Sequence, residues 1–160
     1  MAFGRPRPVQ RNRRGELELH LPSGARQVLA QLCAELRELL GTDDPSLRRL
    51  FPTAYADDAE RDAEYQILAR SELVDRRLAA LSRIEETVEA RTLEEDDVAA
   101  WMHGINQLRL VLGTRLGVSE DELPETPPLD HPDAATWANA WAAYEFLSAL
   151  LDAFVEAESS

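Results

Sequence analysis

Acidic side chains gather where the longest helical pattern of the sequence begins. Asp57, Asp58, Glu60 and Glu64 lie close together, and the two glutamates share a helix face at i, i+4. Carboxylates bind hard cations when several oxygens converge from different segments. However, the chain has no Glu-x-x-His motif, its three histidines are scattered, and acids at a helix start also complement the helix dipole. The pattern therefore assigns no metal or cofactor ligand, and metal or small-molecule binding in this region is an alternative.

Arg109 falls on the apolar face of a predicted helix, among isoleucine and leucine positions. A buried guanidinium needs a carboxylate or several other acceptors. Asn106, three residues earlier, lies on the same side, and Asp57 or Asp58 would be a suitable partner together with Tyr55. We therefore expect a structural polar network of these five residues, with ligand binding by Arg109 as the alternative.

Nucleophilic catalysis has little support in the sequence. The chain lacks the Gly-x-Ser-x-Gly, P-loop and Gly-x-Gly-x-x-Gly motifs. Its one cysteine, Cys33, shares an apolar helix side with Leu29 and Leu36, where a thiol behaves as a small hydrophobic group. A disulfide within the chain is impossible, and no spacing places His103 beside this thiol. We predict no catalytic residue and no enzyme activity.

The charge is distributed unevenly along the chain. The net charge is −13, yet five arginines and no acid lie within residues 1–14: Arg5, Arg7, Arg11, Arg13 and Arg14. The acidic remainder repels a phosphate backbone, so nucleic-acid contact is predicted only through this basic N-terminal arm. The arm either contacts phosphate or an acidic partner, or folds back on the acids of its own chain.

The periodicity of the apolar residues predicts an all-α fold, a bundle of four main helices plus one short helix, with a small N-terminal β-hairpin. Alternation over residues 16–21 predicts a strand that pairs with Val9–Arg11 across the turn at Asn12–Gly15. We expect a basic arm over 1–14, a single helical domain over 15–156 and a short tail over 157–160. The predicted helices run from Ser23 to Leu40, Asp44 to Leu50, Asp57 to about Ala90, Thr92 to Leu116 and Asp133 to Glu156.

The longest predicted helix carries an apolar stripe that should be buried along its whole length, made of Ile67, Val74, Leu78, Leu81, Ile84 and Val88. A proline-rich acidic loop is predicted over 119–132. No apolar run approaches the roughly 20 residues that span a bilayer, and no apolar stretch follows the N-terminal arginines. The sequence therefore predicts a cytoplasmic protein with no membrane segment and no secretory signal.

Two longer motifs resemble a known family. RLFPTAYADD at residues 49–58, followed by Glu64-Tyr65, and NQLRLVLGTRL at residues 106–116 are similar to the signatures of the actinobacterial domain-of-unknown-function family numbered two thousand and seventeen. Its members are often encoded beside the adaptor of the Clp protease, and some are provisionally labelled transcriptional regulators. The family has no assigned catalytic or cofactor residues, so the resemblance implies none here.

The resemblance and the composition favour a non-enzymatic regulatory or adaptor protein that acts through protein–protein contacts, in transcription or proteolysis control. The partner is a protein of unknown identity. A DNA-contacting regulator that uses the arginine-rich arm is the alternative. A homodimer through the long helix or the hairpin edge is a further possibility.

Overall fold

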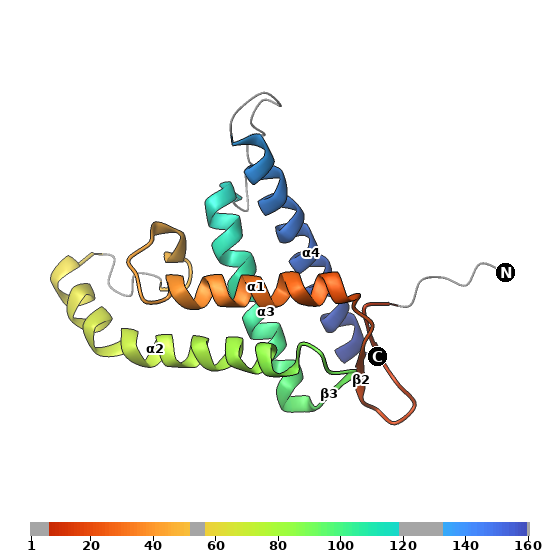
Figure 1. Cartoon of the computed structure of the whole chain (residues 1–160). Coiled ribbons are helices and arrows are strands. Elements are labelled where there is room, and N and C mark those ends of the chain that lie inside the picture. The colour runs from red at the N-terminus through yellow and green to blue at the C-terminus, as the bar shows by residue number, and fades with distance from the viewer. Residues whose placement is uncertain (1–6, 52–56, 119–132, 160) are drawn as a thin grey trace.

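The computed structural model describes residues 7–51, 57–118 and 133–159. Within these ranges the chain forms a mainly helical fold with a small sheet at one end, which confirms the predicted fold class (Figure 1). In chain order the elements are β1 (Val9–Arg11), β2 (Leu17–Leu19), α1 (Ser23–Leu39), the 3-10 helix η1 (Pro45–Leu47), α2 (Ala59–Thr87), β3 (Thr92–Leu93), α3 (Glu95–Leu116) and α4 (Ala134–Glu158).

The predicted hairpin is present, with Val9 opposite Leu19 in antiparallel register. Its turn is held by Asn12, whose Oδ1 accepts hydrogen bonds from the backbone N–H groups of Arg14 and Glu16, both at 2.9 Å. Gly15 has a φ of 82°, a conformation that L residues with a side chain rarely adopt. Asparagine and glycine therefore fix the turn, as their types predict.

A third strand, which the residue pattern does not predict, joins this sheet. β3 pairs antiparallel with β2, with Leu93 opposite Leu17. These residues were expected to open the next helix, which instead begins after Glu94. The carboxylate of Glu94 and that of Asp97 form the capping box of α3. A strand of two residues has no periodicity of its own, so only its neighbours in space reveal it.

Helix α3 is the central element of the fold. It contacts α1, α2, α4 and η1, and Figure 1 shows it crossing the pair formed by α1 and α2 and running beside α4. Trp101 on α3 is fully buried, and its ring centroid lies 5.8 Å from that of Phe154 on α4. Gly117 ends α3 in the left-handed conformation, with a φ of 76°. The predicted central position and C-terminus of this helix are confirmed.

Helix α2 departs from its predicted burial at one end. Leu81 and Ile84 are fully buried, but Ile67 is 79 % exposed, so the prediction of a fully buried stripe is wrong there. The N-terminal part of α2 projects past the end of α1, beyond the elements that cover the rest of the helix (Figure 1). Periodicity identifies the apolar face of a helix but does not show where its neighbours end.

The helices described by the structure include none with both the length and the apolar character that a membrane crossing requires. One continuous apolar core instead joins the sheet and all four helices, from Val9 at the start of the described chain to Ala157 near its end. The sheet therefore packs on the helices rather than standing apart from them.

Candidate functional site

The acidic cluster at the start of α2 is exposed. Asp58 is the N-cap of this helix, and its Oδ1 accepts a hydrogen bond from the backbone N–H of Arg61 at 3.1 Å. Asp57, which was expected to cap the helix, lies one residue before it and is exposed. Tyr55 lies outside the described residues. Over the described ranges, no group of three or more His, Cys, Asp or Glu side chains is placed to hold a metal ion.

Arg109 links α3 to α4. Its Nε donates to the hydroxyl of Ser148 at 2.9 Å, and its Nη1 lies 3.5 Å from Oδ1 of Asn106. Its guanidinium also lies over the ring of Tyr144, 5.6 Å from the centroid. The structure thus brings Arg109 and Asn106 together, as their spacing predicts.

The two aspartates are not among the partners of Arg109 in the described structure. Asp58 is engaged at the N-terminus of α2, and the hydroxyl from α4 takes the place expected for a carboxylate. A neutral partner suffices because Arg109 is half-buried, so solvent compensates part of its charge. A ligand-binding role for this set of residues stays a prediction.

The part of the basic arm that the structure describes, residues 7–14, lies in the hairpin and directly before it. Arg7 and Arg11 approach the acids at the end of α4, with distances of 3.9 Å to Glu156 and 4.0 Å to Glu158. Arg11 also donates to the carbonyl oxygen of Gly15 at 2.7 Å. These exposed pairs contribute little stability, but they orient the two side chains toward the protein's own acids. Arg5 lies outside the described residues.

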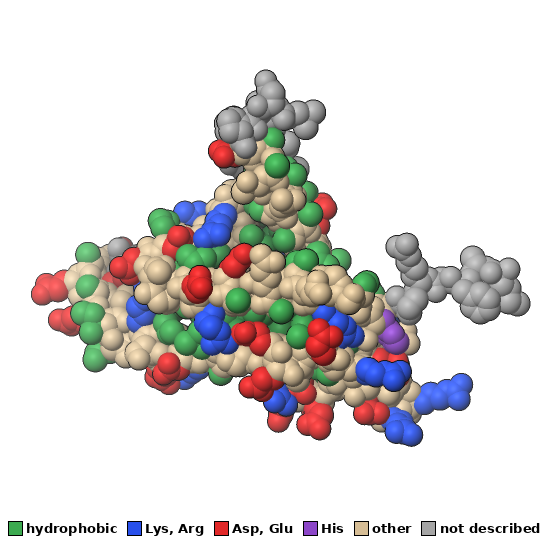
Figure 2. All heavy atoms as spheres, viewed as in Figure 1, with side chains coloured by type: hydrophobic (Ala, Val, Ile, Leu, Met, Phe, Trp, Pro, Cys, Tyr) green, Lys and Arg blue, Asp and Glu red, His purple; other side chains and the backbone are tan. Residues whose placement is uncertain are grey.

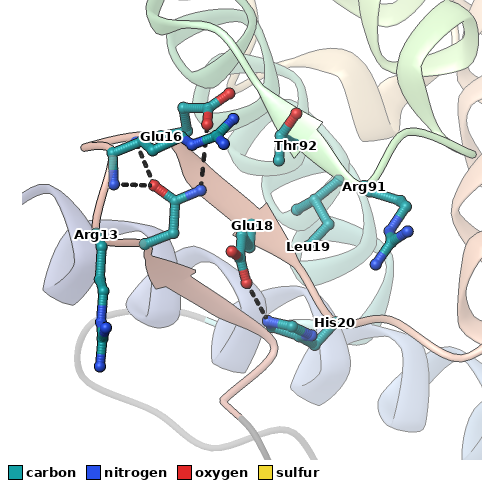
Figure 3. A pocket seen from close by; sticks show the side chains of 9 residues that line it. Arg13, Glu16, Glu18, Leu19, His20, Arg91 and Thr92 are labelled. Carbon is teal, nitrogen blue, oxygen red and sulfur yellow. Dashed lines mark hydrogen bonds and ion pairs between the residues drawn. The ribbon is translucent and has the colours of Figure 1, made fainter.

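A pocket of about 700 Å³ lies beside the hairpin (Figure 3). Arg13 and Arg14 come from the turn of the hairpin, and Arg91 comes from the segment that leads into β3. Figure 3 shows Glu18 paired with His20 between Arg13 and Arg91; the paired atoms are 3.0 Å apart. The pocket is therefore of mixed charge, with an excess of guanidinium groups.

Sequence reasoning missed Arg26, a buried charged side chain at the start of α1, next to the sheet. Arg26 is 9 % exposed and donates to four backbone carbonyl oxygens. It lies three residues before Leu29 and seven before Cys33, so the helical spacing that drew attention to Arg109 also applied here. The four acceptors belong to Leu19, Leu21, Val88 and Ala90.

The thiol of Cys33 is fully buried in the core. Cys33 is 0 % exposed, and desolvation by burial raises the pKa of its thiol from 9.0 to about 12. Glu85 adds to the increase in pKa, while Arg37 opposes it. These two residues pair with each other across α1 and α2 at 2.5 Å. The predicted apolar environment of Cys33 is confirmed, and such a thiol is a poor nucleophile.

The most exposed large apolar side chains of the described structure are adjacent on α2. Ile67 is 79 % exposed and Leu68 is 82 % exposed, and we call these two residues the apolar pair. At helical spacing, the exposed acids Glu60, Glu64 and Asp75 flank the pair on the same side, with the exposed Arg61 among them. Figure 2 shows hydrophobic and acidic side chains together on this projecting end of α2. An exposed apolar surface with a charged border is typical of protein contact sites.

Comparison with known proteins places the chain in a family. The model of the family described as "Domain of unknown function (DUF2017)" matches residues 6–158, and the chain belongs to this family. The resemblance seen in the sequence motifs is thereby confirmed. No solved structure matches the chain significantly.

Curated relatives carry regulatory names. The chain is 34 % identical over 109 residues to "Oxidative stress regulator AosR" of Mycobacterium tuberculosis (strain H37Rv), covering 58 % of the chain and 50 % of that protein. It is 31 % identical over 107 residues to "Putative oxidative stress regulator AosR" of Mycobacterium leprae, covering 56 % and 49 %. The chain thus spans about half the length of the curated relatives it matches.

Proposed function

We propose that this chain is a regulatory protein that acts by binding another protein through the apolar pair on α2. The regulatory names of its relatives support the first part of the proposal. The exposure of Ile67 and Leu68, 79 % and 82 %, is the observation that carries the second part. Burying one such side chain contributes about 1.5–3 kcal/mol. Two adjacent side chains therefore supply an anchor that the isolated chain leaves in water.

The surroundings of the apolar pair indicate the chemistry of the partner. Glu60, Glu64 and Asp75 outnumber the exposed Arg61 around the contact surface, so its border has an excess of acid, and the whole chain has a net charge of −13. A partner should therefore offer an apolar groove bordered by lysine or arginine residues. Such complementarity speeds association and makes the on-rate depend on salt.

The state of Cys33 favours contact with a partner over direct oxidation of this thiol. The relatives are named for oxidative stress, and thiol sensors need an accessible thiolate. Cys33 is the one cysteine of this sequence, and it is fully buried with a raised pKa. A regulatory signal is thus more readily passed on by a binding surface than by this residue.

The test is affinity capture of the tagged chain from a nuclease-treated native lysate, compared across three forms. The wild-type chain should retain one stoichiometric protein partner. The double variant Ile67→Glu, Leu68→Glu should lose it, because two charges would replace the apolar anchor. Val28→Glu is the matched control, since Val28 is an exposed apolar residue (43 %) on α1. A partner that stays bound to the double variant, or that is lost equally in the control, would refute the proposed surface.

The guanidinium groups around the hairpin pocket favour a second candidate, contact with DNA. Arg13, Arg14 and Arg91 line one pocket and could neutralise several phosphates. Binding to duplex DNA should then weaken steeply with salt, and the double variant Arg13→Ala, Arg14→Ala should reduce the slope of log K against log salt by about 0.9 for each lost phosphate contact. A fluorescence anisotropy titration measures this slope. An unchanged slope would exclude the hairpin as a DNA contact.

A further inference from the structure

An apolar groove of about 530 Å³ lies between α1 and α4, apart from both surfaces discussed above. Both helices pack on α3, and Figure 1 shows α1 crossing in front of α4 near the start of α1. The groove is lined mainly by apolar side chains, among them Val28 and Leu32 from α1 and Ala142, Ala143 and Phe146 from α4. Helix α4 therefore has an apolar side that its own chain leaves open.

The two helices are depleted of charge around this groove. Residues 27–34 of α1 and 134–144 of α4 include no charged residue, although 29 % of the whole chain is charged. At that average, these two segments together would carry about five charges, and depletion of charge is what distinguishes the centre of an interface from other protein surface. The composition therefore indicates a contact surface.

The shape of this face allows it to pack against a copy of itself. Val28 is 43 % exposed and gives the face an apolar projection. Ala142 and Ala143, on the facing helix, have short side chains beside the hollow. A contact about a two-fold axis uses the same surface in both copies, so that surface needs both a projection and a hollow.

The charge of the chain decides between a second copy and a basic partner. A basic partner gains from carboxylates at the contact. Among the described residues that line the groove, Glu35 alone is charged, and it already accepts a hydrogen bond from the side chain of Gln31 at 3.3 Å. A second copy, by contrast, carries the same net charge of −13 and meets least repulsion where charge is absent. The uncharged groove therefore favours a second copy.

The size of the face sets the strength of the contact. With the exposed uncharged residues next to it on the same two helices, the groove supplies roughly 15 residues on each side, whereas a standard interface uses about 20–30. A face of this size suits a reversible dimer with a dissociation constant of about 10–100 µM.

We propose that two copies of this chain pair through the groove between α1 and α4, about a two-fold axis. Val28 of each copy packs beside Ala142 of the other. The long helix and the hairpin edge, which the sequence suggested as dimer surfaces, carry the charges that this face lacks. The apolar pair lies on the projecting end of α2 and stays free in such a dimer (Figure 1). The inference therefore does not depend on the proposed protein contact.

The test is sedimentation velocity of the full-length chain from about 1 to 500 µM, a range that brackets the expected dissociation constant. The average mass should rise from 17.9 kDa toward twice that value. Raising the salt from about 50 to 500 mM should strengthen the dimer about threefold or more, because salt screens the repulsion between two acidic chains. On dilution of ¹⁵N-labelled protein, the amide shifts should be confined to α1 and α4 around the groove.

Two matched valine variants make the assignment specific. Val28→Glu brings two carboxylates into the apolar contact and should weaken the dimer about tenfold or more. Val155→Glu makes the same change at an exposed valine (48 %) on α4 outside the groove, and it should keep the dimer. Val28→Glu should still retain the protein partner in the capture experiment, so the failure of either proposal is seen separately.

Four results would each overturn the dimer. They are a chain that stays monomeric up to about 500 µM, equal effects of the two valine variants, a dimer that salt weakens, and dilution shifts outside α1 and α4. The dilution shifts need no substitution, so they decide the matter even where a variant is poorly folded.

Discussion

The guanidinium of Arg26 donates through Nη1 to the carbonyl oxygen of Val88 at 2.5 Å, across 62 positions of the sequence. The same nitrogen reaches the carbonyl oxygen of Ala90 at 2.9 Å, and Nη2 reaches that of Leu19 at 3.2 Å. Arg26 thereby ties the start of α1 to β2 and to the segment between α2 and β3. One side chain thereby positions the sheet against the helices through its bonds to backbone carbonyl oxygens.

Replacing Arg26 with methionine should strongly destabilise the fold. Methionine keeps much of the length and apolar character of the side chain but leaves its acceptors unpaired in a buried environment. We expect a decrease of about 3 kcal/mol in the free energy of unfolding. Urea denaturation followed by circular dichroism measures it. Arg48→Met, at an exposed position, should change the stability by less than about 0.5 kcal/mol. Equal effects of the two variants would show that the carbonyl contacts of Arg26 are not important.

Local signals in the sequence predicted those parts of the fold that depend on neighbouring residues. Gly117 ends α3 as predicted, because a left-handed residue after an apolar helix is a local requirement. Asn106 lies beside Arg109 because a helix places residues three apart together.

Features that depend on distant segments could not be predicted in the same way. Ser148 is the other partner of Arg109, and it comes from a different helix whose position no spacing reveals. The exposure of Ile67 depends on where α1 ends in space rather than on the pattern of α2. The four acceptors of Arg26 are backbone groups, which are the same at every position and leave no trace in the residue types.

The contact between Gly104 and Ile84 gives a prediction about the packing of α2 on α3. A Cβ added at Gly104 would lie 2.3 Å from Cδ1 of Ile84, which is itself fully buried. Gly104→Ala should therefore destabilise the fold by about 1–3 kcal/mol through overpacking, although alanine favours a helix. Gly24→Ala is the matched control, since nothing lies within 4 Å of its Cβ position. A thermal unfolding scan should show a lower Tm for the first variant and an unchanged or higher Tm for the second.

The buried carboxylate of Asp97 caps α3 and pairs with Arg83. Asp97 is 5 % exposed, and its Oδ1 accepts a hydrogen bond from Nε of Arg83. Asp97→Asn should weaken both the pair and the capping box, with a loss of about 1–2 kcal/mol in unfolding free energy. Asp96→Asn, one residue earlier and exposed, keeps the box and should cost less than about 0.5 kcal/mol. If both variants were equally stable, the cap would contribute nothing.

The sealed thiol of Cys33 should resist alkylation in the folded protein. With its pKa raised to about 12, roughly one thiol in ten thousand is ionised at pH 8, and the side chain is fully buried. Iodoacetamide should therefore label the native chain at least about a hundredfold more slowly than the urea-unfolded chain, as measured by mass spectrometry. A variant with Ser71→Cys in a Cys33→Ala background offers an exposed thiol on α2 and should react rapidly when folded. Rapid native labelling of Cys33 itself would contradict its burial.

The same raised pKa makes the stability depend on pH in a defined window. Between pH 9 and pH 12 the unfolded chain loses the thiol proton of Cys33 while the folded chain keeps it. The unfolded state then binds fewer protons, so the free energy of unfolding falls as the pH rises, by up to about 1.4 kcal/mol per pH unit from this group. The comparison with Cys33→Ala isolates this group, because every other titratable residue is the same in both proteins. Urea denaturation of the wild type and of Cys33→Ala should therefore give curves of unfolding free energy against pH that run parallel below pH 8 and converge above pH 9. Curves that stay parallel throughout would show that the thiol ionises as readily in the folded chain as in the unfolded chain.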